Sequence, residues 1–254
     1  MNRIGCYTLF CKETMRFGKV WLQTVAAPVL TALLYQLVFS HALGGRTEAL
    51  RGVPYAVFLI PGLAVMGMAQ SAFANTSSSL IQSRLSGNLV FVLLPPLSAA
   101  DLFAAYTGAA VLRGFAVGLG ILSVSAAFGL PWPQHPVLAL LFAFSGCLAM
   151  AALGFLAGIW AEKYDQLAAF QNFLIVPLTF LSGAFYSLHS LQPFWQAVSR
   201  ANPVFYLTDG FRYAFFGVSD APAALSLAVC TAAAAALSAA VCLLLRSGWR
   251  LRQP

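Results

Sequence analysis

The sequence predicts an all-α integral membrane protein with six transmembrane helices, an N-terminal interfacial helix and re-entrant outer helices between crossings five and six. Of its 254 residues, 60% are hydrophobic and 8% are charged, and the mean hydropathy is +0.82. A chain with so few charges cannot solvate a globular surface of this size. We therefore expect one membrane domain over residues 1–254, surrounded by membrane lipid.

Apolar runs of about 20 residues, the length that spans a bilayer, mark the six crossings. They are expected at 21–42, 55–75, 101–127, 137–160, 169–187 and 223–245. Ahead of the first crossing, residues 1–20 carry apolar groups at Ile4, Tyr7 and Phe10 among charged ones. This mixture is typical of a short helix that lies in the membrane interface.

The positions of lysine and arginine predict which way the helices run. If both termini are cytoplasmic, nine basic residues lie in cytoplasmic segments and four in outer ones. Basic residues favour the cytoplasmic side of a membrane, so we expect both termini there. The net charge of +7 is spread over segment ends rather than gathered in one patch. It therefore indicates topology, and we expect no binding of nucleic acid.

The longest cytoplasmic link, residues 76–100, starts polar and then carries an apolar run at 89–94. This run is too short to span a bilayer, so we expect it to tuck under the membrane or to dock on a partner. Pro95 and Pro96 end the run, because proline cannot continue a helix.

The outer region 188–222 follows a fifth crossing that Pro177 is expected to kink. Asp209 and Arg212 lie three positions apart, so on a helix they share a face and can pair. Two interpretations are open: the region is an outer gate, or its aromatic side chains merely anchor it at headgroup depth. These side chains are Phe194, Trp195, Phe205, Tyr206, Phe211 and Tyr213.

Arg113 is the one charge placed well inside a predicted crossing. A charge there costs about 2.5–3.5 kcal/mol on insertion scales unless it is paired. Its candidate partners are Gln70, Ser71 and Asn75 of the second crossing. We favour such structural pairing over contact with a substrate. Without a facing carboxylate Arg113 makes a poor ion relay, which disfavours proton-driven antiport.

The sequence carries no motif for a catalytic, cofactor or metal site. A nucleotide-binding P-loop needs Gly-x-x-x-x-Gly-Lys-Ser/Thr, and the only Gly-Lys pair, at 18–19, is followed by valine. The five cysteines have no metal-binding spacing. We therefore expect no catalytic residue, metal or bound cofactor in this chain. Any use of ATP would require another polypeptide.

Three groups of residues, in order along six crossings, carry a resemblance to a known family. They are Pro61-Gly62, then Gly87-Asn88-Leu89 with Leu93-Leu94-x-Pro96-Leu97-Ser98, then Asn202-Pro203-x-x-Tyr206-x-x-Asp209-Gly210-x-Arg212. Together they resemble ABC-2 type transporter permeases, the membrane subunits of ATP-binding cassette exporters, and among these the YadH-like subgroup. The resemblance covers essentially the whole chain.

The resemblance implies a permease of the bacterial cytoplasmic (inner) membrane that works as a homodimer with two copies of a separate ABC ATPase. That partner would bind ATP and Mg, and substrate would move outward. The coupling residues in the link 76–100 would be Gly87, Asn88, Leu89, Phe91, Leu93 and Leu94. The residues of the outer re-entrant gate would be Asn202, Pro203, Tyr206, Asp209 and Arg212. Where the family commonly has an acidic coupling residue, this chain has Val90, which implies a weaker or rearranged polar contact.

The substrate class is the least constrained part of this interpretation. An apolar lining with few charges favours an amphipathic molecule over a small ion, so lipid-linked glycans, drugs and other lipophilic molecules remain open. A second hypothesis is a membrane anchoring or assembly protein without transport activity. A lipid-modifying enzyme ranks lowest, because no carboxylate cluster or metal motif faces the membrane surface.

Overall fold

The computed structural model describes residues 2–43 and 53–248, and every regular element in these two ranges is a helix. Five helical stretches are long and apolar enough to cross a membrane. They are Leu22–Ala42, Tyr55–Leu85, Ala99–Phe128, Pro136–Trp160 and Ala223–Ser247. The all-α membrane fold is thus confirmed, and five of the six predicted crossings coincide with these helices.

The helices follow one another with short links. The first half contains α1 (Arg3–Lys19), a π-helical turn (Leu22–Ala26), α2 (Ala27–Leu43), α3 (Tyr55–Leu85), α4 (Leu89–Leu93) and α5 (Ala99–Ser125). The second half contains α6 (Pro136–Trp160), α7 (Tyr164–Phe170), a second π-helical turn (Gln171–Ile175), α8 (Val176–Phe180), α9 (Pro193–Ala201), α10 (Pro203–Phe216) and α11 (Ala223–Ser247).

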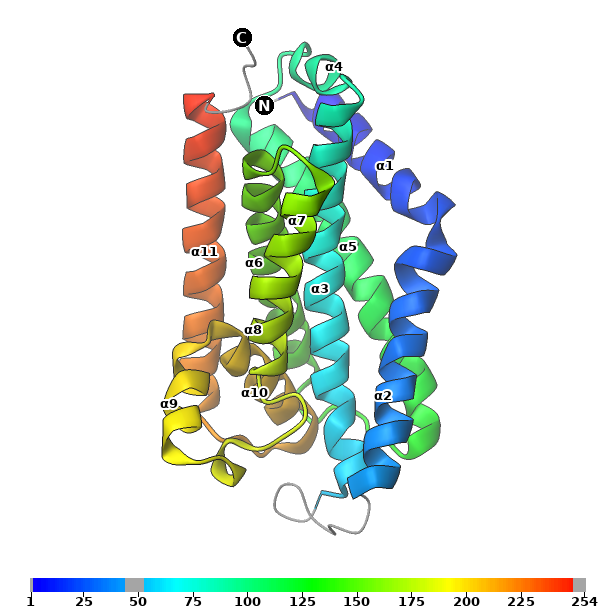
Figure 1. Cartoon of the computed structure of the whole chain (residues 1–254), viewed down its shortest axis with the longest axis vertical. Helices are drawn as coiled ribbons and strands as arrows, with labels where there is room; N and C mark the ends of the chain where they lie inside the picture. Colours follow the sequence, from blue (N-terminus) through cyan, green and yellow to red (C-terminus); the bar gives the residue numbers. More distant parts are fainter. Residues whose placement is uncertain (1, 44–52, 249–254) are drawn as a thin grey trace.

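α3 is the centre of the bundle, with α2, α5, α6 and α10 packed around it (Figure 1). In its most apolar 18-residue window, 78% of the residues are buried, against 17% in the corresponding windows of α2 and α11. α3 therefore forms the core of the protein. α2 and α11 present most of their apolar side chains outward, to lipid or to another protein surface.

Glycines allow α6 to approach α3 closely. A Cβ atom at Gly154 would lie 2.3 Å from the carbonyl oxygen of Phe73, and one at Gly158 would lie 3.2 Å from that of Ser77. The two glycines are four positions apart, so they share one face of α6. Small residues at such positions strengthen helix association in hydrocarbon, where no hydrophobic force drives helices together.

The predicted fifth crossing, 169–187, is helical only as far as Phe180 and contains a π-helical turn. α7, the π-helical turn and α8 are 7, 5 and 5 residues long, and they run beside α6 and α3 along the bundle (Figure 1). Pro177 lies two residues after the π-helical turn, and the helix ends at Leu181. The π-helical turn is an irregularity next to the proline, and the kink expected at Pro177 stays a prediction. That this segment crosses a membrane remains a prediction, because its helical part is shorter than the usual span of about 20 residues.

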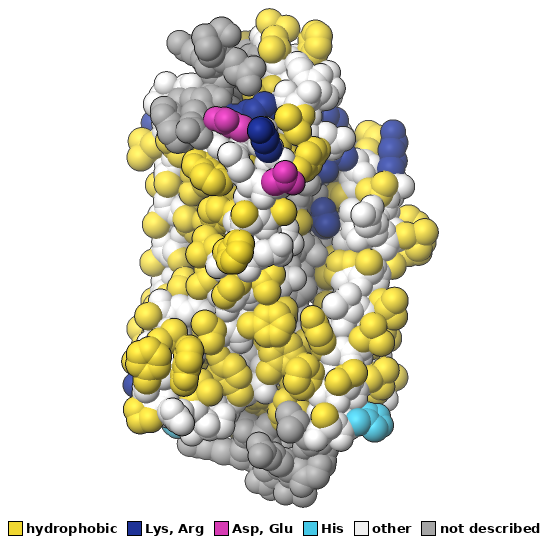
Figure 2. All heavy atoms as spheres, in the orientation of Figure 1, with side chains coloured by type: hydrophobic (Ala, Val, Ile, Leu, Met, Phe, Trp, Pro, Cys, Tyr) yellow, Lys and Arg dark blue, Asp and Glu magenta, His cyan; other side chains and the backbone are white. Residues whose placement is uncertain are grey.

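The two ends of the bundle differ in composition. α1, α4 and the last turns of α11 lie at one end, here called the α4 end, whereas α9 and α10 lie toward the other, the α9 end (Figure 1). Lysine and arginine side chains gather toward the α4 end, and apolar side chains cover the flank below it (Figure 2). The preference of basic residues for the cytoplasm predicts that the α4 end faces inward.

Candidate functional site

The predicted coupling residues form α4 and the turn before it. Gly87 follows α3 with a φ of 72°, a left-handed conformation that glycine adopts without steric cost. α4 then exposes apolar side chains, because Val90, Phe91 and Leu94 are 61%, 70% and 69% exposed. A group of large apolar side chains exposed at the basic end of a protein is typical of a contact surface.

The remaining coupling residues add no described apolar side chain of such high exposure. Asn88 is exposed and Leu89 is half-buried. The side chain of Leu93 lies outside the described part of the structure. The segment as a whole has the predicted form, a short helix that does not span, and its contact with an ATPase stays a prediction.

Both ends of this coupling segment are fixed to long helices. The Ser98 hydroxyl accepts a hydrogen bond from the Asp101 N–H at 3.2 Å, and the Asp101 carboxylate accepts one from the Ser98 N–H at 3.1 Å, a reciprocal cap on α5. The same carboxylate accepts the N–H of Asn2 at 3.2 Å, which ties the start of α1 to α5. At the end of α3, Arg84 donates to two C-terminal carbonyl oxygens of α6, at 2.7 and 3.0 Å.

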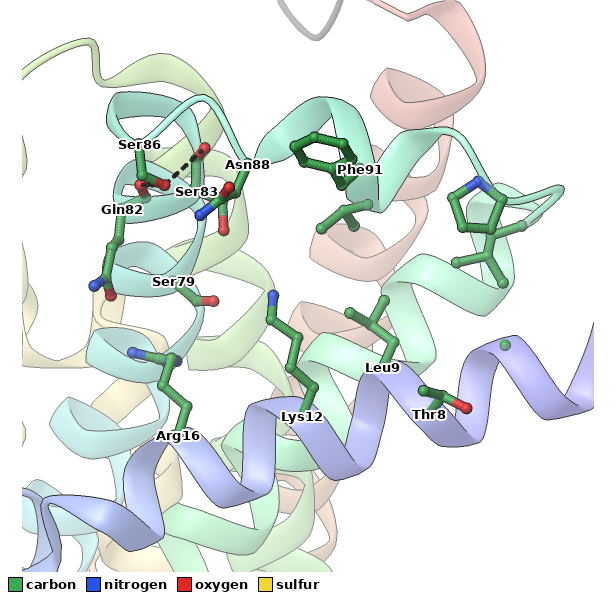
Figure 3. A pocket seen from close by; sticks show the side chains of 14 residues that line it. Thr8, Leu9, Lys12, Arg16, Ser79, Gln82, Ser83, Ser86, Asn88 and Phe91 are labelled. Carbon is green, nitrogen blue, oxygen red and sulfur yellow. Dashed lines mark hydrogen bonds between the residues drawn. The ribbon is translucent and has the colours of Figure 1, made fainter.

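A cleft of about 690 Å³ opens between α1, the last turns of α3 and the coupling segment. Figure 3 shows Lys12 and Arg16 extending from α1 toward α3, with Asn88 and Phe91 near the start of α4 above them. The cleft therefore combines two cationic side chains with an apolar rim. A partner surface that carries acidic and apolar groups would complement it.

Glu13, which no sequence motif singles out, fixes α1 to α3. Its carboxylate is fully buried and accepts hydrogen bonds from the Ser79 hydroxyl at 2.6 Å and from Arg16 Nε at 3.1 Å. Lys12 Nζ lies 3.3 Å from the same carboxylate. Arg16 also donates to the backbone and side-chain oxygens of Asn75, at 2.8 and 3.1 Å. α1 is thus locked to the central helix through charged hydrogen bonds.

The spacing in α1 contains a signal for this buried carboxylate. Leu9, Glu13 and Phe17 lie four positions apart, and all three are buried. A charged residue on such a stripe indicates a polar partner beneath it. By contrast, Ile4 and Tyr7, which we expected on the apolar face, are 82% and 69% exposed.

At the α9 end, each of the predicted gate residues has its own contact. The Asn202 amide oxygen accepts an N–H of the first turn of α10 at 3.0 Å, and its amide nitrogen donates to the Leu178 carbonyl oxygen at 2.7 Å. Pro203 begins α10, where its missing N–H is no loss. Tyr206 packs edge-on against Phe205, with ring centroids 5.3 Å apart.

Asp209 and Arg212 are both buried, and in the described ranges no ion pair joins them, although their spacing allows one. The Asp209 carboxylate accepts two backbone N–H groups of the link to α11, at 2.8 and 2.9 Å. Burial raises the pKa of this carboxyl, and the two hydrogen bonds oppose the rise. Arg212 donates to the Gly183 carbonyl oxygen at 2.8 Å and lies 3.8 Å from the centroid of the Phe58 ring. Backbone groups of neighbouring links therefore hold each charge separately.

The six aromatic side chains of this region differ in exposure, and Tyr206 and Tyr213 are half-buried. Phe205 and Phe211 are 1% and 3% exposed and belong to the core, whereas Phe194 and Trp195 of α9 are 68% and 45% exposed. Only the second pair has the exposure that anchoring at headgroup depth requires. The outer gate remains a prediction.

We expect Asp209→Ala to lower the free energy of unfolding by about 2–3 kcal/mol, because two part-buried N–H groups lose a charged acceptor. Asp209→Asn, which keeps one acceptor oxygen, should fall between the native protein and the alanine variant. Thermal unfolding in mild detergent would measure the effect. Native stability of Asp209→Ala together with reduced export would instead favour the gate interpretation.

Arg113 lies in the middle of α5 without any of its expected partners. Gln70 donates to the Thr179 hydroxyl at 3.0 Å, and the Asn75 side chain accepts from Arg16. Within residues 2–43 and 53–248, no hydrogen bond or ion pair reaches the Arg113 guanidinium, and its Nε is buried without a partner. The structural pairing that we favoured from the sequence is therefore absent for Gln70 and Asn75, because neighbouring groups already hold both side chains. Ser71, the third candidate, lines the same cavity as Arg113, and no hydrogen bond joins the two among the described residues.

Comparison with known proteins agrees with this architecture. The model of the family described as ABC-2 type transporter matches residues 5–216. The chain is 35% identical over 221 residues to the inner membrane transport permease YadH of Escherichia coli (strain K12), a match that covers 86% of each chain. It is 26% identical over 208 residues to nodulation protein J of Rhizobium meliloti (strain 1021), covering 81% of this chain and 79% of that relative. The chain belongs to the ABC-2 type transporter family.

Proposed function

We propose that this protein is the transmembrane permease subunit of an ATP-binding cassette exporter in a bacterial inner membrane. Membership of the ABC-2 type transporter family supports a transport role. The observation that carries the proposal furthest is the exposed apolar helix α4 beside the basic cleft of α1. A separate ATPase, which would bind ATP and Mg, is the partner that this end of the bundle would contact.

In the proposed mechanism, ATP binding draws two ATPase subunits together, and their movement enters the permease through α4 and α1. α4 follows directly on α3, and Glu13 and Arg16 join α1 to the same central helix. A displacement of either contact would therefore move α3 and the helices packed around it. Helices transmit such motion as rigid units, because hydrocarbon does not tolerate unpaired backbone groups.

The proposal includes a homodimer, six crossings per chain and both termini in the cytoplasm. α2 carries a stripe of exposed apolar side chains, since Leu30, Leu34 and Val38 are 58%, 53% and 61% exposed. These positions are four apart and form one face of the helix. In a dimer this face would meet the second copy, and an amphipathic or lipid-linked substrate or drug would move outward between the two copies.

The alternative function is a membrane anchoring or assembly protein without transport activity. The exposed helix α4 is compatible with this alternative too, because a docking surface does not by itself require transport, whereas membership of a transporter family supports the exporter. Movement of a substrate at the expense of ATP is the property that separates the two functions.

Inverted inner-membrane vesicles provide this test. Vesicles from cells with and without the protein are incubated with the amphiphile fraction of a cell extract and with either ATP or a non-hydrolysable analogue. Mass spectrometry of the washed vesicle contents is expected to show at least one amphiphile that accumulates only with ATP and only with the protein. Equal contents with both nucleotides would support the anchoring function.

A further inference from the structure

We propose that the cavity beside Arg113 binds the anionic group of an amphipathic molecule, a phosphate or carboxylate that carries an apolar tail. The cavity has a volume of about 320 Å³. It lies between α2, α3, α5 and the π-helical turn at Gln171–Ile175. Binding of an anion at this cavity does not depend on the transport function proposed above. Only the identification of that anion as the transported substrate rests on it.

Arg113 is a buried cation that has no partner among the described residues. The residue is 9% exposed, lines the cavity and has no hydrogen-bond or ionic partner among the described residues. A guanidinium offers five N–H donors in a planar fork that fits carboxylate and phosphate oxygens. A charge left unpaired within a membrane helix is unfavourable, and charges retained there are usually functional.

In the described part of the chain, no carboxylate lies in the cavity to compete with a bound anion for Arg113. Among the residues that line the cavity there is no aspartate or glutamate. The described carboxylates belong to α1, to the first turn of α5, to the α6–α7 junction, to α10 and to the link after it. They are Glu13, Asp101, Glu162, Asp165, Asp209 and Asp220. None is in the middle of a membrane-length helix.

The rest of the cavity wall is lined by neutral polar side chains and by apolar ones. Its polar side chains are uncharged, and those able to donate hydrogen bonds include Gln23, Ser71 and Gln171. Apolar side chains such as Leu63 continue the same wall. Neutral donors around one cation favour an anion, and the apolar part of the wall fits a hydrocarbon tail.

Both π-helical turns of the described residues contribute a side chain to this cavity. Gln23 belongs to the turn at Leu22–Ala26, and Gln171 belongs to the turn at Gln171–Ile175. Each turn ends two residues before a proline, Pro28 or Pro177. π-Helical turns interrupt regular α-helices at an energetic cost and occur frequently at functional sites. Their coincidence at the cavity of the unpaired arginine supports a binding function.

The test is equilibrium binding of radiolabelled decyl phosphate to the purified full-length protein in phosphatidylcholine nanodiscs. The native protein is expected to bind the probe saturably. Arg113→Gln should weaken binding at least tenfold, whereas Arg113→Lys, which keeps the charge but not the planar fork, should retain part of it. Arg200→Gln is the matched control, because Arg200 is exposed on α9 and lies outside the cavity. Native affinity in Arg113→Gln would overturn the proposal.

Two competitors identify the source of the anion. Phosphatidic acid in the disc displaces decyl phosphate if the natural occupant is a membrane phospholipid, and it does not if the site takes single-tailed amphiphiles. Either result leaves the shared chemistry intact. Displacement by inorganic phosphate at the concentration of decyl phosphate would show that the tail contributes nothing, which would overturn the amphipathic assignment.

Thermal unfolding separates binding from a structural role. The melting temperature of Arg113→Gln is expected to equal or exceed the native value, because the substitution removes an unpaired charge. A lower melting temperature together with lost binding would make Arg113 a structural residue and overturn the proposal. Binding that depends on Arg113 in a protein without an ATPase partner would refute the transport function alone. An ATPase partner with binding independent of Arg113 would refute the site alone.

Discussion

A protein that carries Phe91→Asp and Leu94→Asp is expected to lose its ATPase during purification while its membrane fold is preserved. The two native side chains are 70% and 69% exposed, so their replacement removes little from the core. It places two negative charges in an apolar contact, and burying an unpaired charge costs several kcal/mol. We expect at least a hundredfold loss of affinity. Affinity purification in mild detergent, followed by mass spectrometry for a P-loop ATPase, would measure it.

Phe194→Asp is the matched control for this variant. Phe194 is 68% exposed, like the two residues of the coupling segment, but it belongs to α9 at the opposite end of the bundle. The control should keep the ATPase. Retention of the ATPase by the double variant, or an equal loss from the control, would contradict the assignment of α4 as the contact.

Replacement of Glu13 by alanine is expected to destabilise the protein by about 3 kcal/mol and to loosen the contact of α1 with α3. The substitution removes a fully buried carboxylate and leaves the Ser79 hydroxyl and the Arg16 Nε–H without their acceptor, while Arg16 still donates to Asn75. Breaking a buried ion pair costs about 3–5 kcal/mol, and the lower value applies here because the Arg16 side chain is 26% exposed and can be hydrated. Thermal unfolding in detergent and protease sensitivity of residues 3–19 would report the two effects.

Two variants control for the Glu13 result. Glu13→Gln keeps an acceptor for Ser79 but no charge, so its stability should be intermediate. Asp165→Ala removes an exposed carboxylate from the first turn of α7 and should change stability by about 0.5 kcal/mol or less. If Glu13→Ala were as stable as Asp165→Ala, the proposed role of Glu13 in holding α1 against α3 would be refuted.

The sequence was sufficient to predict the five helices that are long and apolar enough to cross a membrane, because a run of about 20 apolar residues has few alternatives to a membrane helix. The segment from Tyr164 to Phe180 is the exception. A hydropathy pattern records that its residues are apolar, but the π-helical turn there depends on how Pro177 and the neighbouring helices accommodate the missing N–H. The position of the π-helical turn is therefore a property of the packed structure.

The candidate sites were predictable only in part, for a related reason. Spacing along a helix places Asp209 and Arg212 on one face, but it does not say which backbone groups cover that face. Links from distant parts of the chain supply those groups. Likewise, the sequence marks Arg113 as unusual, whereas the cavity beside it requires four separate segments to meet. The short helix of the coupling segment was predicted most completely, because its apolar run is local, whereas its contact with an ATPase stays a prediction.

The most direct test of the central claim, that this chain is driven by an ATPase bound at α4, is site-specific photo-cross-linking in intact cells. A benzophenone amino acid replaces Phe91 in one version and Phe194 in the other, at positions of equal exposure. We expect irradiation to join a P-loop ATPase to the protein from position 91 and not from position 194. Capture of no ATPase at position 91, in a protein that is inserted and folded, would contradict the account.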